Sequence, residues 1–207
     1  MTVMEKVDLK KALKSFYNPS AKQCAIVDVP AMNFLMLDGA GDPNTAPAFQ
    51  AAVETLYAVS YTLKFMLKKQ GVADYAVMPL EGLWWTPNMA EFTIADKSNW
   101  LWTIMIAQPP FITAEQVAAA KAEAARKKEL SLIGQLRFEP YQEGLAAQIM
   151  HLGPFAAEGP TIAKLHAFIA DQGYALTGKH HEIYLSDFRR TAPEKLKTVI
   201  RQPMGHA

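Results

Sequence analysis

The order of parts in the first half of the chain recurs in the second half. In the first half, an apolar segment at residues 34–37 is followed by a turn with Gly and Pro, a helical pattern, a glycine and a tyrosine. In the second half, an apolar segment at residues 145–152 is followed by the same succession. Each half then enters an apolar strand that carries one glutamate, Glu81 or Glu182. This weak repeat predicts two pseudo-symmetric β-α-β-β units, with the glutamates at related places on one sheet.

Two such units predict an α+β fold, in which a mainly antiparallel sheet carries helices on one face. A length of 207 residues is compatible with one domain. Within a single domain of residues 1–207, we place the first unit at about 22–107, a linking helix at 113–131 and the second unit at about 136–203.

Local signals agree with this division. Apolar residues from Phe49 to Leu67 recur at steps of four and three, which marks one face of a helix. Capping boxes that begin at Thr113 and Thr191 predict the starts of the linking helix and of a last short helix. Residues 160–171 carry the helical pattern of the second unit. Strands are predicted at 23–29, 34–37, 75–85, 91–95, 100–107, 145–152 and 180–185.

Charge and composition exclude several classes of partner. Twenty-one Lys and Arg against 20 Asp and Glu leave a net charge of +1 with no strongly basic run, so we expect no nucleic-acid binding. The apolar stretches are too short to span a bilayer and no signal peptide is present, so we expect a cytoplasmic protein without a membrane partner. Cys24 is the single cysteine and the five histidines lack metal-ligand spacing; we therefore expect no metal and no cofactor. A homodimer is left open.

Four tryptophans lie within one short stretch of the chain: Trp84, Trp85, Trp100 and Trp102. Fully burying an indole requires a hydrogen-bond partner for its N–H group. The cluster therefore indicates either an aromatic layer of the core or the aromatic wall of a binding site. The core is favoured on this ground alone, because aromatic residues are common in strands.

Glu182 lies within an alternating strand. Because successive side chains point to opposite faces, Glu182 and Tyr184 share one face, while Ile183 and Leu185 share the other. If Ile183 and Leu185 pack under the helices, Glu182 and Tyr184 point to the open face of the sheet. In the first unit, the same parity places Glu81 on one face with Leu83 and Trp85.

A glutamate beside indoles and phenols is partly desolvated, so we expect the pKa of Glu182 to be raised. Such a carboxyl group suits a general base near neutral pH, or the single negative charge of an aromatic site for cations. The alternative is a structural ion pair at the end of the sheet, with Lys179, Arg189 or Arg190 as the partner.

Five segments form a combination that is more specific than any one of them: Asp8–Tyr17, Tyr61–Phe65, Pro79–Trp85, Gly178–Asp187 and Thr191–Pro203. Together they resemble the GyrI-like small-molecule-binding family, over nearly the whole chain. The free-standing branch with the EGLWW motif resembles proteins described as cyclopropanoid cyclopropane hydrolases, which open the strained ring of DNA-alkylating natural products. Related domains of multidrug-sensing regulators bind lipophilic cations for an attached DNA-binding module, for which the first twenty or so residues here are too few.

This resemblance implies a ligand cleft between the two units, lined by aromatics, with Glu182 as the acid at its centre. Glu182 would act as a base on water, and the phenol of Tyr184 or Tyr61 would donate to the carbonyl oxygen on which negative charge develops. The partner would be a lipophilic aromatic small molecule. The expected ligand-binding residues are Trp84, Trp85, Trp102, Tyr61 and Glu81.

Three functions therefore stay open. A hydrolase would accept neutral planar electrophiles, whereas a non-catalytic module that binds or sequesters amphipathic drugs would favour cationic dyes. A structural protein without a ligand would bury its tryptophans and leave them unresponsive to added compounds. Fold alone does not decide among these.

Overall fold

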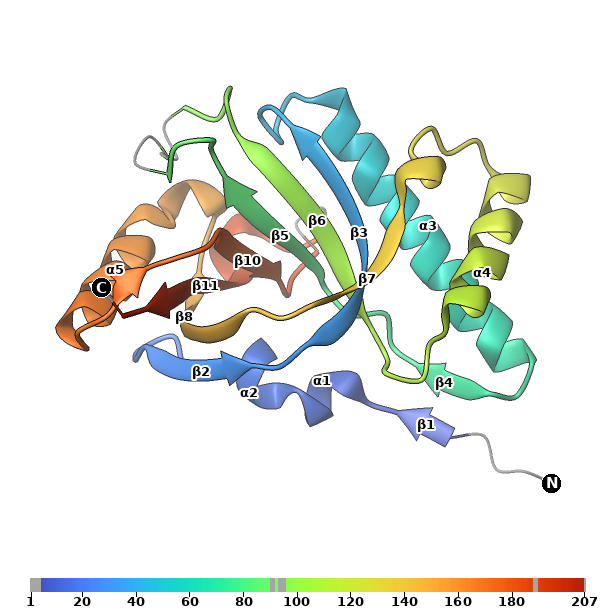
Figure 1. Ribbon diagram of the computed structural model, residues 1–207, viewed down its shortest axis with the longest axis horizontal. Coiled ribbons are helices and arrows are strands. Elements are labelled where there is room, and N and C mark those ends of the chain that lie inside the picture. The colour runs from blue at the N-terminus through green and yellow to red at the C-terminus, as the bar shows by residue number, and fades with distance from the viewer. Residues whose placement is uncertain (1–4, 90–91, 93–95, 188–189, 207) are drawn as a thin grey trace.

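The computed structural model describes residues 5–89, 92, 96–187 and 190–206 (Figure 1). Its strands are β1 (Glu5–Val7), β2 (Ala25–Val29), β3 (Met32–Ala40), β4 (Ala73–Tyr75), β5 (Leu80–Trp85), β6 (Leu101–Gln108), β7 (Arg137–Tyr141), β8 (Gly144–Leu152), β9 (Ala175–Leu176), β10 (His180–Tyr184) and β11 (Lys197–Gly205). Its α-helices are α1 (Leu9–Ala12), α2 (Lys14–Tyr17), α3 (Pro47–Lys69), α4 (Ala114–Lys127) and α5 (Gly159–Asp171), and short 3-10 turns occupy Ile133–Gln135, Phe155–Ala157 and Pro193–Lys195.

A large antiparallel sheet forms the central layer of the described residues. Its strand order is β2-β8-β11-β10-β5-β6-β3-β7, and β9 pairs with the end of β11. The sheet is open, since β2 and β7 stand at its two ends. A separate parallel pair joins β1 to β4. The α+β architecture predicted from the repeat is confirmed.

The strand order has an approximate two-fold symmetry. Exchanging β2, β3, β5 and β6 with β7, β8, β10 and β11 gives the same order in reverse. The pseudo-axis therefore passes between β5 and β10, the neighbouring strands that carry Glu81 and Glu182. Each unit also gives its first strand to the other half of the sheet, because β2 pairs with β8 and β7 pairs with β3. The two pseudo-symmetric units are thus confirmed, with an exchange of edge strands that the sequence did not reveal.

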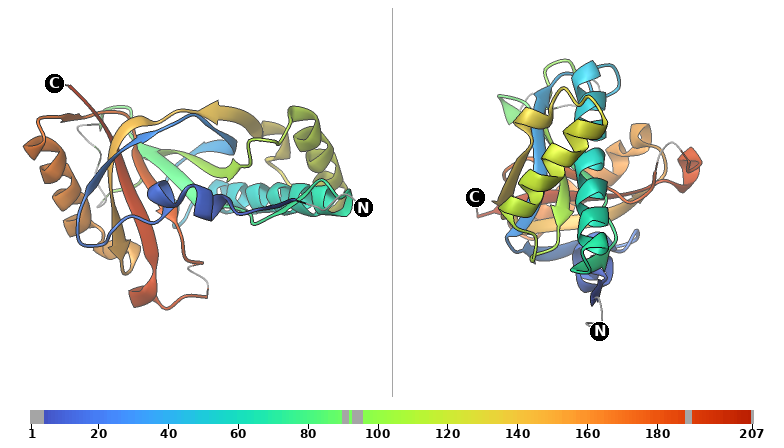
Figure 2. Two further views of the ribbon diagram at one scale, coloured as in Figure 1. Left: turned by 90° about the horizontal axis from the view of Figure 1, so that it is seen from below. Right: turned by 90° about the vertical axis from the view of Figure 1, so that its right-hand side faces the viewer.

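The helices α3 and α5 cover one face of the sheet, which we call the helix face (Figures 1 and 2). α3 turns buried side chains such as Leu56 and Leu63 toward β3 and β6. α5 packs Leu165 and Ile169 against residues that include Ile200 of β11. α4 packs beside α3, as Figure 2 shows. Each unit therefore supplies one helix to the same face.

Strand register places Glu182 on the helix face. Ile200, which packs with α5, lies directly opposite Glu182 on β11. Ile183 lies on the other face, which we call the back face, together with Glu81, its direct partner on β5. The condition considered above, in which Ile183 packs under the helices and Glu182 faces away from them, is therefore not met for α3 and α5. Alternation establishes which side chains share a face, but not which face the helices cover.

Several local predictions are confirmed and others are corrected. The capping box at Thr113 forms, since its hydroxyl accepts from the backbone of Gln116 and the Gln116 side chain accepts in return. The box at Thr191 does not form, because the following segment is a 3-10 turn whose N-cap is Ala192. The strand predicted at 75–85 is divided into β4 and β5.

The strand predicted at 91–95 lies, apart from Phe92, outside the described residues. Among the helices of the described part of the chain, none is long and apolar enough to cross a membrane.

Candidate functional site

The candidate site is centred on the carboxyl group of Glu182, near the pseudo-axis. His180, Glu182 and Tyr184 alternate along β10 and so share the helix face. The Tyr184 hydroxyl donates to Glu182 Oε2 over 2.7 Å, and His180 Nε2 lies 3.1 Å from Glu182 Oε1. His180 and Glu182 are buried and Tyr184 is half-buried. Both oxygens of this buried carboxyl group therefore have a hydrogen-bond partner.

A second buried carboxyl group, that of Glu158, accompanies Glu182. Glu158 is the N-cap residue of α5 and is only 3% exposed. Burial and the negative charge of Glu182 raise the pKa of Glu158 to about 9. Burial also acts to raise the pKa of Glu182, but its hydrogen bonds with His180 and Tyr184 outweigh this and the pKa of Glu182 is lowered. The two carboxyl groups therefore share one proton, which resides on Glu158.

The expected rise in the pKa of Glu182 is thus wrong, and the raised pKa belongs to its neighbour. The sequence does not mark Glu158, because its local context, directly before Gly and Pro at a helix start, is ordinary for an acidic residue. Only the packing of α5 on the sheet brings the two carboxyl groups together. The Oε1 atom of Glu158 is buried and has no hydrogen-bond partner within the described residues.

The structural ion pair considered for Glu182 is not found with the two candidates that the structure describes. The Lys179 ammonium group lies 3.4 Å from the ring centre of Trp85, and Arg190 Nε lies 3.9 Å from Asp187. Arg189 lies outside the described residues.

Aromatic side chains border His180, Glu182 and Tyr184, which we call the Glu182 cluster, on the helix face. Trp84 lies directly opposite His180 on one side and Trp102 on the other. Phe49 of α3 packs against both indoles, at centroid distances of 5.8 Å from Trp84 and 5.3 Å from Trp102. Trp100 adds a third indole, 5.3 Å from that of Trp84. Trp84 and Trp100 are 2% exposed and Trp102 is fully buried, so they form the predicted aromatic core layer.

Two glycines provide the space for these indoles. A Cβ atom on Gly82 would lie 2.7 Å from Trp84 Nε1, and one on Gly39 would lie 2.1 Å from the ring of Trp102. Gly82 is also the direct partner of Glu182 across the two central strands. The glycine of the EGLWW motif therefore allows an indole to lie flat on the sheet beside the Glu182 cluster.

Two other predicted site residues, Glu81 and Trp85, lie on the back face. Register places both with Ile183 and away from Glu182. Trp85 is half-buried under the Lys179 ammonium group. The structure therefore does not bring Glu81 or Trp85 together with Glu182.

Glu81 belongs to a buried ionic network. The Tyr17 hydroxyl of α2 donates to Glu81 Oε1 over 2.6 Å, and His181 Nε2 lies 3.0 Å from Glu81 Oε2. His181 Nδ1 lies 2.9 Å from Glu143 Oε1, and Arg201 donates to Glu143 Oε2 over 2.9 Å. Burial acts to lower the pKa of His181, but the two carboxylates raise it to about 9. This network holds α2 against the back face.

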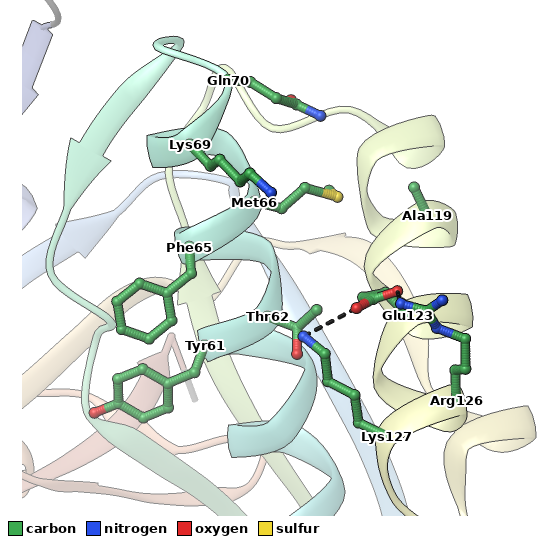
Figure 3. A pocket seen from close by; sticks show the side chains of 10 residues that line it. All are labelled: Tyr61, Thr62, Phe65, Met66, Lys69, Gln70, Ala119, Glu123, Arg126 and Lys127. Atoms are coloured by element: carbon green, nitrogen blue, oxygen red, sulfur yellow. Dashed lines mark ion pairs between the residues drawn. The ribbon is translucent and has the colours of Figure 1, made fainter.

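Tyr61, the alternative phenol, lies on α3 in the wall of a groove between α3 and α4. The groove has a volume of about 780 Å³, and Figure 3 shows Tyr61 and Phe65 on α3, with Glu123 and Lys127 on α4. Tyr61 is 46% exposed and its ring stacks between those of Tyr57 and Phe65. Of the two phenols considered, Tyr184 is the one that contacts Glu182.

Residues 22–204 match the GyrI-like small molecule binding domain. The chain belongs to the GyrI-like family. The match spans both units and the linking helix, which confirms the resemblance seen in the sequence.

Solved structures of similar proteins extend this comparison. An uncharacterized conserved protein from Listeria innocua is 41% identical, with a TM-score of 0.89 over 96% of this chain and 100% of that one. A hydrolase from Listeria innocua is 40% identical, with a TM-score of 0.87 over 97% of this chain and 100% of that one. The EcmrR C-terminal domain is 16% identical, with a TM-score of 0.56 over 89% of this chain and 98% of that one, and shares the fold alone. The search of curated proteins finds no match.

Proposed function

We propose that this GyrI-like protein hydrolyses planar, electrophilic cyclopropanoid compounds, with Glu182 as the general base. The observation that carries the proposal is the buried carboxyl group of Glu182, which accepts from the Tyr184 hydroxyl over 2.7 Å and lies 3.1 Å from His180 Nε2. A buried, ionised carboxylate can take a proton from water, and a phenol can donate one. Similarity to a Listeria innocua hydrolase, at 40% identity over 97% of this chain, supports a hydrolytic role.

The proposed reaction balances with the residues at hand. Glu182 takes a proton from water as the water oxygen bonds to the activated cyclopropane carbon. The ring C–C bond breaks, and its electron pair passes through the conjugated system to the carbonyl oxygen. Tyr184 donates its proton to that oxygen, which becomes a hydroxyl group. The proton on Glu182 then returns to the Tyr184 oxygen across their hydrogen bond, 2.7 Å long in the resting state, and the product is the substrate plus one water.

The tryptophans suit the binding of a flat substrate in this proposal. Trp84 and Trp102 are adjacent indoles beside the Glu182 cluster, and stacking on indoles favours planar aromatic compounds. Movement of Trp100 or Trp84 would be needed to admit a ligand, because both are buried. Glu158, which stays neutral, acts as a positioning residue that keeps a single negative charge on the pair.

A second candidate is a non-catalytic module that binds or sequesters amphipathic drugs. The description of the matched domain as small molecule binding favours it, since that description names no chemistry. A cytoplasmic location and a homodimer are further proposals that rest on the sequence alone.

A timed reaction separates the two candidates. The purified protein is mixed with a duocarmycin-type cyclopropane compound, and the products are followed by mass spectrometry. We expect a product heavier by one water with the wild type and with the control Glu129→Gln, an exposed site, but none above background with Glu182→Gln. Quenching of tryptophan fluorescence without any product would instead identify a binding module.

A further inference from the structure

Lys97 lies against the aromatic part of the candidate site. It belongs to the connection between β5 and β6, is half-buried, and its Nζ lies 4.8 Å from the ring centre of Trp100. The Trp100 indole packs on that of Trp84, the residue directly opposite His180. A cation over an indole face interacts favourably with the ring. An ammonium group of the protein therefore already occupies the kind of position that a cationic aromatic ligand would seek.

The charge of Lys97 also acts on both buried carboxyl groups. It acts to lower the pKa of Glu158 and that of Glu182. This agrees with its place over Trp100, whose indole packs on Trp84 of the strand next to β10. With one proton on Glu158, the pair carries a single negative charge. Lys97 offsets that charge, and His180, 3.1 Å from Glu182 Oε1, adds no negative charge, so the site has no net negative charge to offer to a ligand.

We propose that Lys97 is a specificity-determining residue, which makes the site select uncharged planar aromatic compounds over aromatic cations. This inference rests on the proposed function, because it concerns the charge of the compound bound beside Glu182. An isolated buried carboxylate attracts a cation, as in aromatic sites for ammonium compounds. A carboxylate whose charge is already offset by a nearby lysine gains little from a second cation, which the lysine repels.

A matched pair of probes tests this selection. Acridine is uncharged above neutral pH, whereas 10-methylacridinium has nearly the same shape and a permanent positive charge. Both can be titrated against the protein by quenching of tryptophan fluorescence. We expect the wild type to bind acridine more tightly than 10-methylacridinium, and Lys97→Met to bind the cation about tenfold more tightly than the wild type does. Affinity for acridine should change less than about twofold.

Two variants control the experiment. Lys97→Arg keeps the positive charge and should retain the preference of the wild type. Lys14→Met removes an exposed lysine of α2, the helix held against the back face, and should leave both affinities unchanged. The two controls therefore separate the effect on affinity of losing any positive charge from the effect of losing the charge of Lys97.

Three results would overturn the inference: a wild type that prefers the cation, a Lys97→Met variant with an unchanged ratio of affinities, or a wild type that binds neither probe. Failure of the proposed function is distinguishable from these. Absence of a hydrolysis product, together with a preference for acridine that Lys97→Met removes, would refute catalysis and leave the charge selection standing.

Discussion

At the scale of single residues, the proposed chemistry depends on the buried carboxyl group of Glu182, with the raised pKa of Glu158 beside it. Strand alternation predicts that Glu182 and Tyr184 share a face, and the motif around residue 182 makes them candidates for the site. Glu158 could not be found in the same way, because its neighbours in space lie on strands distant in sequence. The direction of the pKa shift of Glu182 does not follow from burial alone, because the hydrogen bonds that oppose burial form only in the fold.

Stability should depend on pH through Glu158. Its pKa is raised in the fold from an ordinary 4.5 to about 9, so its proton stabilises the fold fully below the lower value, and this contribution is lost as pH rises toward the higher one. The loss is on the order of 1 kcal/mol per pH unit. Glu158→Gln should lack this part of the decline in the free energy of unfolding, measured with urea at several pH values. An identical pH dependence in both proteins would contradict the shared proton.

A side chain at Gly82 should lower the stability of the fold. Because a Cβ atom there would lie 2.7 Å from Trp84 Nε1, Gly82→Ala should displace the indole and lower the free energy of unfolding by about 1–3 kcal/mol. Gly134→Ala is the matched control, since no atom lies within 4 Å of the added carbon there. Equal stability of the two variants would show that Trp84 does not need the space above Gly82.

At the scale of elements, the long helix α3 and the capped helix α4 were predictable because their signals are local. Apolar periodicity marks α3, and the capping box at Thr113 marks the start of α4. The position of α1 and α2 was not predictable, since it depends on the ionic network on the back face of the sheet. That network joins Tyr17 to Glu81, and the Phe16 carbonyl to Arg201.

Tyr17→Phe should loosen the contact between α2 and the sheet. Loss of the hydroxyl leaves Glu81 Oε1 buried without its 2.6 Å hydrogen bond, which should cost about 1–3 kcal/mol in the free energy of unfolding. The same substitution at the exposed Tyr61 serves as the control and should change stability by less than about 0.5 kcal/mol. Should both variants unfold at the same urea concentration, the network would not anchor α2.

At the scale of the whole molecule, the pseudo-two-fold relates the strands but not the two glutamates. The helices α3 and α5 both lie on the helix face. The pseudo-axis therefore runs through the sheet and cannot exchange its two faces. Glu182 opposes Gly82 while Glu81 opposes Ile183, which places the glutamates on opposite faces. The repeat predicted the architecture correctly, yet a one-residue offset between β5 and β10 separates an apparent pair of acids. Glu182 therefore lies on the helix face, whereas Glu81, on the back face, anchors the N-terminal segment through Tyr17.

The pH dependence of cyclopropane hydrolysis tests the central claim, that the carboxyl pair performs the chemistry with a single shared proton. We predict that the rate falls on the alkaline side as pH passes about 9, where Glu158 ionises and a second negative charge opposes charge development on the substrate. Glu158→Gln should lose this alkaline fall, and Glu182→Gln should lose hydrolysis by at least about a hundredfold. An alkaline fall that persists in Glu158→Gln, or a Glu182→Gln variant as fast as the wild type, would contradict the account.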